Sequence, residues 1–571
     1  MKKTVNDFWR RCILACIGLL PLYVFAQSGI TVRGSVSDTR KEPVIGATVI
    51  VKGNVNQGTI TDMDGRYELR DVPSGATLVF SYIGTKTQEI AVEGRSTIDV
   101  ILSEDDQLLD EVVVVGYGTQ KKVNLTGSVA SINMNELTES RPITNTSHAL
   151  AGMVAGVSVR SGKNQPGDDN AGILVRGQGT LNSSAPLIII DGVEAGINTV
   201  NPQDIESMSV LKDAASASIY GSRAANGVVL ITTKQGKEGD VKIDYNGYIS
   251  SESIRKTLTP VSNYADYMEL VNEGWKNSGK SRVFSDKSIK AWRDDAGRNP
   301  LKYPNTDWVD ETFRPSVSTN HTLSVSGGSK NMRYYGSFGY LDNPGVMENA
   351  GFTRYNARLN LDANLKSWLK IGMQLSGYVS NMGPAAGSVV KDVFTYTSAT
   401  TPGMVFRSPD GRYGAMNNLE DASQSANNNP LRRLNSVSGN TRKNNMRTRF
   451  FGVLNLFKGF MIIGSYSYEF VNLFQDRKPV FLDGWNFTDN TVTLPGAGKT
   501  SITNVSDKIE RFFNDLVANY ETSLFDSRMN LKAMVGASQE LYREKKFSAR
   551  RYNLIDPNLD VIDDRDRKSV V

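Results

Sequence analysis

The chain has 571 residues, of which 39% are hydrophobic, 9% aromatic and 22% charged, and this composition excludes both a disordered chain and a bundle of membrane helices. Its 65 lysine and arginine residues exceed its 60 aspartate and glutamate residues by only five, so the bulk charge does not indicate a nucleic-acid partner. At about 150 residues per domain, the length predicts several domains or one large barrel.

The first 26 residues have the layout of a secretory signal peptide. Two lysines and two arginines precede an apolar run over residues 12–25, and the segment ends in Val24-Phe25-Ala26, which is typical of a cleavage site. A lipoprotein signal ending at Cys16 is the alternative, but the apolar run continues past this cysteine. Because Cys12 and Cys16 are the only cysteines, the mature chain is expected to contain no disulfide and no thiolate metal site.

Residues 30–102 alternate short β-rich runs with turn residues. The runs are expected to be strands at 31–36, 47–51, 65–69, 77–82 and 96–102. Strands this short and this closely spaced predict a small β-sandwich. The sequence Asp62-Met63-Asp64-Gly65 lacks the further ligands of a calcium loop, so we expect it to be an Asp-Gly hairpin turn.

A valine-rich segment follows within residues 103–119. Its sequence is Asp110-Glu111-Val112-Val113-Val114-Val115-Gly116-Tyr117-Gly118. Four consecutive β-branched residues favour an extended strand over a helix. The strand is either buried in the next domain or exposed and donated to the sheet edge of another protein. The spacing alone does not choose between these alternatives.

Residues 127–234 form a glycine-rich segment that predicts a compact α+β domain. Residues 187–190 followed by Asp191-Gly192 predict a strand closed by a turn, and residues 204–213 predict a short capped helix followed by a strand. Gly177 and Gly179 lack the third glycine of a dinucleotide fingerprint. We therefore expect no cofactor site at these glycines.

After residue 240 the pattern changes to long strands of period two. Apolar and polar residues alternate strictly over residues 355–364, as in a barrel wall that faces lipid on one side and water on the other. Eight further strands are expected at 241–249, 321–326, 332–340, 369–379, 446–457, 460–470, 512–520 and 531–537. Outside the first 26 residues, no apolar run reaches the roughly 18 residues of a membrane helix.

The connections between these strands alternate in length. Short turns are expected at 327–330, 365–367, 458–459 and 525–528, and longer loops at 252–318, 341–354, 382–445 and 472–507. Outer-membrane barrels alternate short periplasmic turns with long external loops, whereas a soluble array of β-sandwiches has no need of this order. We therefore predict a mainly β protein that ends in an incomplete transmembrane barrel of about nine strands.

The sequence offers little material for catalysis. His148 and His321 are its only histidines, so catalytic triads and histidine metal sites have almost no candidate residues. No pair of carboxylates can be placed across a cleft from the sequence. We expect no enzyme activity, no metal site and no cofactor.

A series of motifs in a fixed order then resembles a known family. After the sandwich and the valine-rich segment come Arg176-Gly177, Thr180-Leu181, residues 186–192 with Asp191-Gly192, residues 201–207 with Asp204 and Glu206, and residues 212–234 with Lys212, Asp213, Tyr220, Gly221, Arg223, Asn226 and Gly227. Thr306-Asp307-Trp308 and residues 324–328 continue the match. These motifs closely resemble the SusC/RagA-type TonB-dependent transporters of Bacteroidetes outer membranes, and the resemblance covers essentially all of residues 30–240.

After the signal peptide at 1–26, the resemblance implies four parts and a set of partners. The parts are a carboxypeptidase-regulatory-like β-sandwich at 30–102, a linker at 103–119 with a TonB box from Asp110 to Gly118, a plug at 120–235 and part of a barrel at 240–571. The implied partners are TonB with its proton-motive-force complex, a SusD-like surface lipoprotein and outer-membrane lipid, and the implied substrate is a glycan or a peptide. Nucleic acid is not among them.

The number of strands departs from the family pattern. Nine is an odd number, whereas the family barrel resembles 22-stranded plugged transporters, and single-chain outer-membrane barrels have an even strand number. We therefore expect a truncated chain whose sheet stays open, with free edges at the strand near Val241 and at the strand near Leu531.

The expected function is TonB-dependent import of a large oligosaccharide or peptide across the outer membrane. The alternatives are a surface or secreted β-rich adhesin without transport, and a passive porin. Trp275, Trp292, Tyr303 and Trp308 lie in the expected external loops. Their rings are candidates for stacking on sugars, or alternatively for the aromatic belt of a membrane interface.

Overall fold

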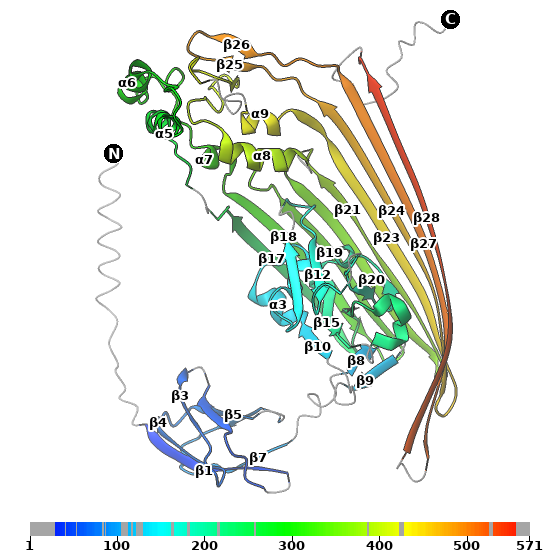
Figure 1. Ribbon diagram of the computed structural model, residues 1–571. Helices are drawn as coiled ribbons and strands as arrows, with labels where there is room; N and C mark the ends of the chain where they lie inside the picture. The colour runs from blue at the N-terminus through cyan, green and yellow to red at the C-terminus, as the bar shows by residue number, and fades with distance from the viewer. Residues whose placement is uncertain are drawn as a thin grey trace, which may run out of the picture. The chain divides into compact units, whose positions relative to one another are not determined.

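The computed structural model describes residues 29–39, 42–52, 54–82, 85, 87–103, 112–115, 118–121, 129–161, 165–179, 183–213, 217–255, 259–384, 388–421, 428–524 and 529–554 (Figure 1). The expected signal peptide lies outside these residues, as do Asp110, Glu111, Gly116 and Tyr117 of the expected TonB box. The chain divides into two compact units, residues 1–113 with 120–125, and residues 114–119 with 126–571. In the described part of the chain, no helix is long and apolar enough to cross a membrane.

The first unit contains a β-sandwich, as predicted. One sheet has the order β4 (Arg66–Val72), β1 (Ile30–Asp38), β7 (Val100–Leu102), and the other has the order β3 (Asn54–Ile60), β2 (Thr48–Val51), β5 (Thr77–Ser81), β6 (Gln88–Ala91). Alternate residues such as Val32, Val49 and Phe80 are fully buried in one core shared by the two sheets. The strands β3 and β6 were not predicted, because their sequences lack a clear apolar run.

The turn at Asp62–Gly65 is present but differs from the predicted hairpin. The side chain of Asp62 accepts hydrogen bonds from the amides of Asp64 and Arg66 at 2.9 and 2.8 Å, and Gly65 has a φ of 71°. However, β3 before the turn and β4 after it belong to opposite sheets. The turn therefore links the two layers of the sandwich instead of joining neighbours within one sheet.

The valine-rich segment is extended, as its β-branched residues predict. Strand β8 (Val112–Val115) pairs with β9 (Gly118–Lys121) in a two-stranded sheet. This pairing was not predicted from the sequence, because β9 contains only polar residues and glycine.

The plug folds around a five-stranded sheet. The strand order is β10 (Val129–Asn133), β15 (Ile205–Leu211), β16 (Val228–Thr233), β13 (Leu187–Ile190), β14 (Val193–Glu194). Helix α3 (Met134–Ser140) follows β10, and β11 (Val157–Ser161) pairs with β12 (Ala171–Val175) in a separate hairpin. The central strands consist mainly of buried aliphatic residues, which accounts for their position inside the sheet.

In the described part of the plug, four short 3-10 turns connect these strands. They are η2 (Thr146–Leu150), η3 (Ile197–Thr199), η4 (Pro202–Asp204) and η5 (Ser218–Ala224). The sequence prediction of a helix beginning at Asp204 is wrong. Asn201 caps the short turn η4 by accepting a hydrogen bond from the amide of Gln203 at 3.3 Å, and β15 begins directly at Ile205 because its buried apolar residues pack within the sheet.

The remainder of the second unit is built on a large antiparallel sheet, which we call the wall. Its nine strands in the described residues follow chain order: β17 (Gly239–Glu252), β18 (Ser316–Gly328), β19 (Met332–Asn343), β20 (Phe352–Lys366), β21 (Leu369–Met382), β23 (Val437–Phe457), β24 (Phe460–Pro479), β27 (Ser501–Leu524) and β28 (Met529–Tyr552). All nine predicted strands are confirmed, and they are longer than predicted. In the same residues β17 and β28 have one neighbour each, so the sheet is open, as expected. Figure 1 shows this sheet curving around the plug.

The short connections at 329–331, 367–368 and 458–459 agree with prediction, whereas the long ones contain structure that was not predicted. These elements are α5 (Tyr264–Asn277), α6 (Asp286–Asp295), α7 (Trp308–Thr312), α8 (Ser388–Ala399), β22 (Tyr413–Gly414), α9 (Pro430–Leu434), β25 (Gly484–Asn486) and β26 (Thr491–Leu494). They enclose two apolar cores of their own. The long loops are therefore packed structures.

Candidate functional site

Five arginines on the wall point at the plug, and we call them the wall arginines: Arg354, Arg358, Arg447, Arg449 and Arg511. Strand pairing aligns three of them in one row across β20, β21, β23, β24 and β27. Arg358 is opposite Ser376, Ser376 opposite Arg447, Arg447 opposite Glu469, and Glu469 opposite Arg511. Directly opposed residues project from the same face of a sheet, so this row forms a basic band that faces the plug.

Arg358 lies between two buried plug carboxylates. Its Nη1 is 3.3 Å from Asp191 Oδ2 and 3.1 Å from Thr233 Oγ1, and its Nε is 3.9 Å from Asp204 Oδ2. The three charged side chains are only 4%, 9% and 3% exposed, in the order Arg358, Asp191, Asp204. In such a poorly hydrated site, opposite charges attract more strongly than in water, so this cluster ties the plug to β20.

Both carboxylates, those of Asp191 and Asp204, also accept hydrogen bonds from neighbouring residues. Asp191 accepts from the amide and the hydroxyl of Thr233 at 2.9 and 2.8 Å. Asp204 accepts from the hydroxyl of Tyr335 on β19 at 2.9 Å. Asn360 on β20 donates to Thr233 Oγ1 at 3.2 Å and to the carbonyl of Lys234 at 2.7 Å. The plug carboxylates are thus paired and hydrogen-bonded, as buried charges require.

Three other wall arginines bind main-chain carbonyls of the plug. Arg449 donates to the carbonyl of Asp191 at 2.8 Å. Arg354 donates to that of Asn198 at 3.0 Å, and Arg511 to that of Glu194 at 3.2 Å. Arg447 donates to Thr199 Oγ1 at 3.4 Å. Residues 191–199 are therefore held by the wall mainly through their backbone.

The turn at Asp191-Gly192 presents this backbone to the wall. Ile190 pairs with Val193, which leaves a two-residue hairpin loop with φ values of 51° and 87°. Positive φ at both central residues is typical of a type I′ turn, in which Asp-Gly is a favoured sequence. This chemistry explains why the predicted strand closes at residue 190.

A more exposed ion cluster joins the plug to the last two wall strands. Arg223 is 2.7 Å from Glu194 and 3.3 Å from Glu540, and Arg511 is 3.3 Å from the same Glu540. These side chains are between 22 and 52% exposed, so each pair contributes less than the buried cluster does. Arg223 is nevertheless one of the predicted motif residues that contact the wall.

The other predicted motif residues mostly stabilise the plug itself. Arg176 forms an ion pair with Asp213, Lys212 donates to the carbonyl of Ala155 at 2.9 Å, and Asn226 donates to that of Ser183 at 3.1 Å. Gly177, Gly221 and Gly227 have φ values of 92°, 64° and 87°, Tyr220 packs on a plug core, and Glu206 lies 3.6 Å from Lys237. The motif therefore maintains the shape of the plug.

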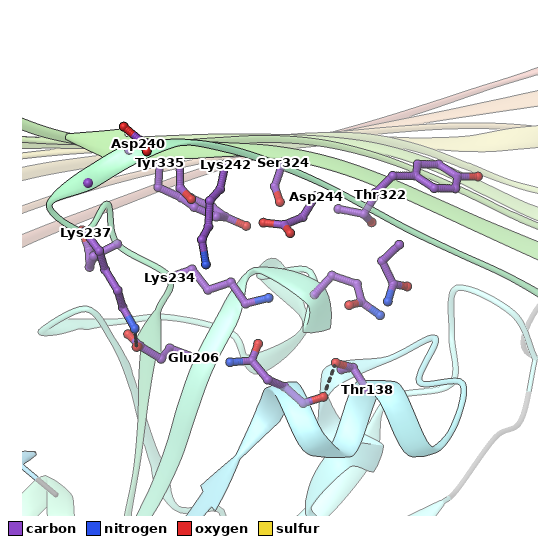
Figure 2. A pocket seen from close by; sticks show the side chains of 18 of the residues that line it. Thr138, Glu206, Lys234, Lys237, Asp240, Lys242, Asp244, Thr322, Ser324 and Tyr335 are labelled. Carbon is purple, nitrogen blue, oxygen red and sulfur yellow. Dashed lines mark hydrogen bonds and ion pairs between the residues drawn. The ribbon is translucent and has the colours of Figure 1, made fainter. Parts of the chain in front are cut away.

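A polar cavity of about 860 Å³ separates the plug from strands β17–β19. Figure 2 shows Lys234 and Lys242 extending into it, with Asp244 and Thr322 on the wall side and Thr138 of α3 on the plug side. Burial lowers the pKa of Lys234, although the nearby carboxylates of Asp204 and Asp244 oppose this shift. Between the plug and β17–β19, charged and hydroxyl groups therefore line a cavity and do not form a closely packed interface.

The structure does not support the expected role of Trp292 as a sugar-stacking ring. Its ring is 5% exposed, donates from Nε1 to the carbonyl of Pro304 at 3.1 Å, and lies 5.0 Å from the ring centres of both Tyr264 and Tyr303. Trp308 is buried as well. Trp292 and Tyr303 pack in or against the apolar core of the first long loop. Trp275 is 42% exposed, so its ring remains accessible.

The wall arginines were not singled out from the sequence. Arg358 occupies a polar position of the strictly alternating strand 355–364, which predicted a water-facing side chain, and Arg447 and Arg449 lie in the expected strand 446–457. Arg354 falls in the expected loop 341–354, and Arg511 lies just before the expected strand 512–520. Their contacts with the plug join residues more than 120 positions apart in the chain. The available signal was the placement of several arginines on the inner face of neighbouring strands.

Comparison with known proteins agrees with this architecture. Residues 32–114 match the CarboxypepD_reg-like domain, and residues 121–228 match the TonB-dependent Receptor Plug Domain. The TonB-dependent receptor SusC of Bacteroides thetaiotaomicron is 42% identical over 375 residues, which are 63% of this chain and 35% of that protein. The TonB-dependent receptor P26 of Formosa agariphila is 32% identical over 520 residues, or 89% of this chain and 48% of that protein.

A solved structure has a similar fold. The structure of the RagAB peptide importer in its open-open state superposes with a TM-score of 0.61 at 26% identity, and the match covers 77% of this chain and 50% of that one. The chain spans between 35 and 48% of the length of the two curated relatives described above.

The regulatory-like sandwich, the plug and the curved antiparallel wall agree with the architecture of a TonB-dependent receptor. Within this class, the sequence relatives and the RagAB structure support a receptor of the SusC/RagA type.

Proposed function

We propose that a receptor containing this chain imports a large polar nutrient across the bacterial outer membrane. The observation that carries this proposal is the plug bound to the inner face of the wall by the wall arginines. A plug held in this way blocks passive entry, so import requires work on the plug. The relatives named above are receptors and importers, and we propose no catalytic activity.

The proposed source of this work is TonB with its proton-motive-force complex. The proposed contact is the TonB box at residues 110–118, whose strand β8 supplies main-chain groups for pairing with a partner strand. In this proposal the signal peptide is removed after export. A SusD-like surface lipoprotein captures the substrate outside the cell.

The proposed substrate is an oligosaccharide or a peptide. The similarity to SusC and to the RagAB peptide importer supports these two classes. The exposed ring of Trp275, with Lys280 Nζ 4.9 Å from its centre, is a proposed contact for the substrate in the first long loop.

Replacing Val113 with proline tests the role of the box. Proline removes one ladder N–H and fixes φ, so we expect energy-dependent import to fall to the level seen without TonB, while the amount of receptor in the outer membrane stays unchanged. Uptake of labelled oligosaccharides and peptides, with and without collapse of the proton gradient, provides the measurement.

The matched control is Val113→Ala, which keeps the N–H and leaves the strand able to pair. It should import nearly as well as the parent. Wild-type import by the proline variant would show that the box is misplaced, and uptake that survives collapse of the gradient in the parent would contradict TonB dependence.

A further inference from the structure

The plug is attached to the wall unevenly. On the side of β20, β23, β27 and β28, the wall arginines, Asn360 and Glu540 bind the plug at residues 191–199, 204, 223, 233 and 234. On the side of β17–β19, the polar cavity lies between the two surfaces. There Asn201 donates to Thr322 Oγ1 at 3.3 Å, and Tyr335 binds Asp204.

The plug elements nearest to the TonB box lie on the cavity side. Strand β10 is the first strand of the plug sheet after β9, and it lies at the edge of this sheet, next to β15. Helix α3 follows it, and its residues Asn135, Thr138 and Glu139 line the cavity. Force transmitted through the TonB box therefore acts first on β10 and on α3, and α3 borders the cavity. The opposite edge of the sheet, β13 and β14, is the one bound by Arg449 and Arg511.

The cavity also offers unused hydrogen-bonding capacity. Gln203 lines it and is 6% exposed, and its Nε2 has no hydrogen-bond partner among the described residues. Hydroxyl, amide and charged groups make up most of the remaining lining. A buried amide without a partner favours a polar ligand that accepts a hydrogen bond, and the volume lies within the roughly 300–1,000 Å³ of typical ligand sites.

From this asymmetry we infer that the substrate path opens at the cavity between the plug and β17–β19, while the wall arginines keep the opposite side of the plug in place. This inference rests on the proposed import function. The plug pivots on its arginine-bound side, and the path accepts a hydrated chain whose hydroxyl or amide groups replace water, as an oligosaccharide or a peptide does.

Two engineered cross-links separate this motion from the alternatives. Asn201→Cys with Thr322→Cys joins the plug to β18 on the cavity side, where the two side chains are 3.3 Å apart. Thr233→Cys with Asn360→Cys joins it to β20 on the arginine side, where the corresponding distance is 3.2 Å. Both pairs replace one asparagine and one threonine that are hydrogen-bonded to each other, so the chemical change is the same in the two variants. The only native cysteines, Cys12 and Cys16, lie in the expected signal peptide.

Both variants are oxidised, or joined by a short thiol-reactive cross-linker, in outer membranes of cells that express the receptor, and gel mobility after proteolysis confirms each link. We expect the link at 201–322 to reduce import by about tenfold or more, because it prevents the motion that gates passage. Reduction should restore import. The link at 233–360 should leave import near the level of the same variant in reduced form.

The other outcomes overturn the inference. If both links block import, the plug leaves the wall as one body. If neither link blocks it, the path does not run between the plug and β17–β19, and if only the link at 233–360 blocks it, the path lies on the arginine side. A parent receptor without engineered cysteines that imports nothing in the presence of TonB contradicts the proposed function itself. This result is distinct from every pattern of cross-link effects.

Discussion

Replacing Arg358 with leucine is expected to weaken the attachment of the plug to strand β20, where Arg354 and Asn360 keep their own contacts. The change leaves the buried carboxylates of Asp191 and Asp204 without their cation, and removal of one partner from a buried ion cluster destabilises it by about 3–5 kcal/mol. The folded wall should remain, because its strand pairing does not depend on this side chain. The measurement is the rate at which a protease cleaves the plug of the purified receptor, together with entry of a large antibiotic into cells.

Two further variants make this test specific. Arg333→Leu removes an exposed arginine of β19, and its effect should lie within about 0.5 kcal/mol. Adding Asp191→Asn to Arg358→Leu removes one of the two uncompensated charges, so the double variant should recover part of the lost protection. Unchanged protease resistance in Arg358→Leu would contradict the assigned role of the cluster.

Replacing Trp292 with alanine is expected to destabilise the packed first loop by about 3–5 kcal/mol, the usual effect of deleting a buried tryptophan. The ring fills the core between α5 and α6 and contacts both Tyr264 and Tyr303. The loss should appear as faster hydrogen exchange and faster proteolysis in residues 264–303. The wall strands should keep their protection, since this core lies outside them.

Trp275→Ala is the matched control, because it removes a tryptophan that is 42% exposed from the neighbouring helix α5. Its main contact among the described residues is with Lys280, and such an exposed cation–π pair contributes about 0.5–1 kcal/mol. Loop protection should therefore stay close to that of the parent. Normal protection in Trp292→Ala combined with lost substrate binding would restore the ligand-stacking role that the buried ring argues against.

The wall was predictable because its information is local. Strict alternation over residues 355–364 and its neighbours specifies which face each side chain occupies, and antiparallel strands joined by short turns have few alternative pairings. The strand ends were less predictable. Main-chain ladders continue through polar residues, as at the start of β23 and the end of β24, where the alternation of apolar side chains has faded.

The site was predictable only in part. Asp191-Gly192 was identified through its turn chemistry, and Asp204 through the family motif. Their common partner Arg358 is 167 residues away from Asp191 in the chain, and no local pattern encodes that contact. The same reason explains Trp292. Exposed and buried aromatic residues are indistinguishable in a loop until its partner helices are placed, and α5 and α6 were not predicted.

The wall arginines bind carbonyl groups of residues 191, 194 and 198, and every amino acid carries such a group. Side chains along this stretch can consequently change over evolution without loss of these contacts, provided that the backbone keeps its course. These contacts between the plug and the wall therefore tolerate substitutions. A chain built in this way can vary these side chains while the carbonyl contacts that hold its plug remain the same.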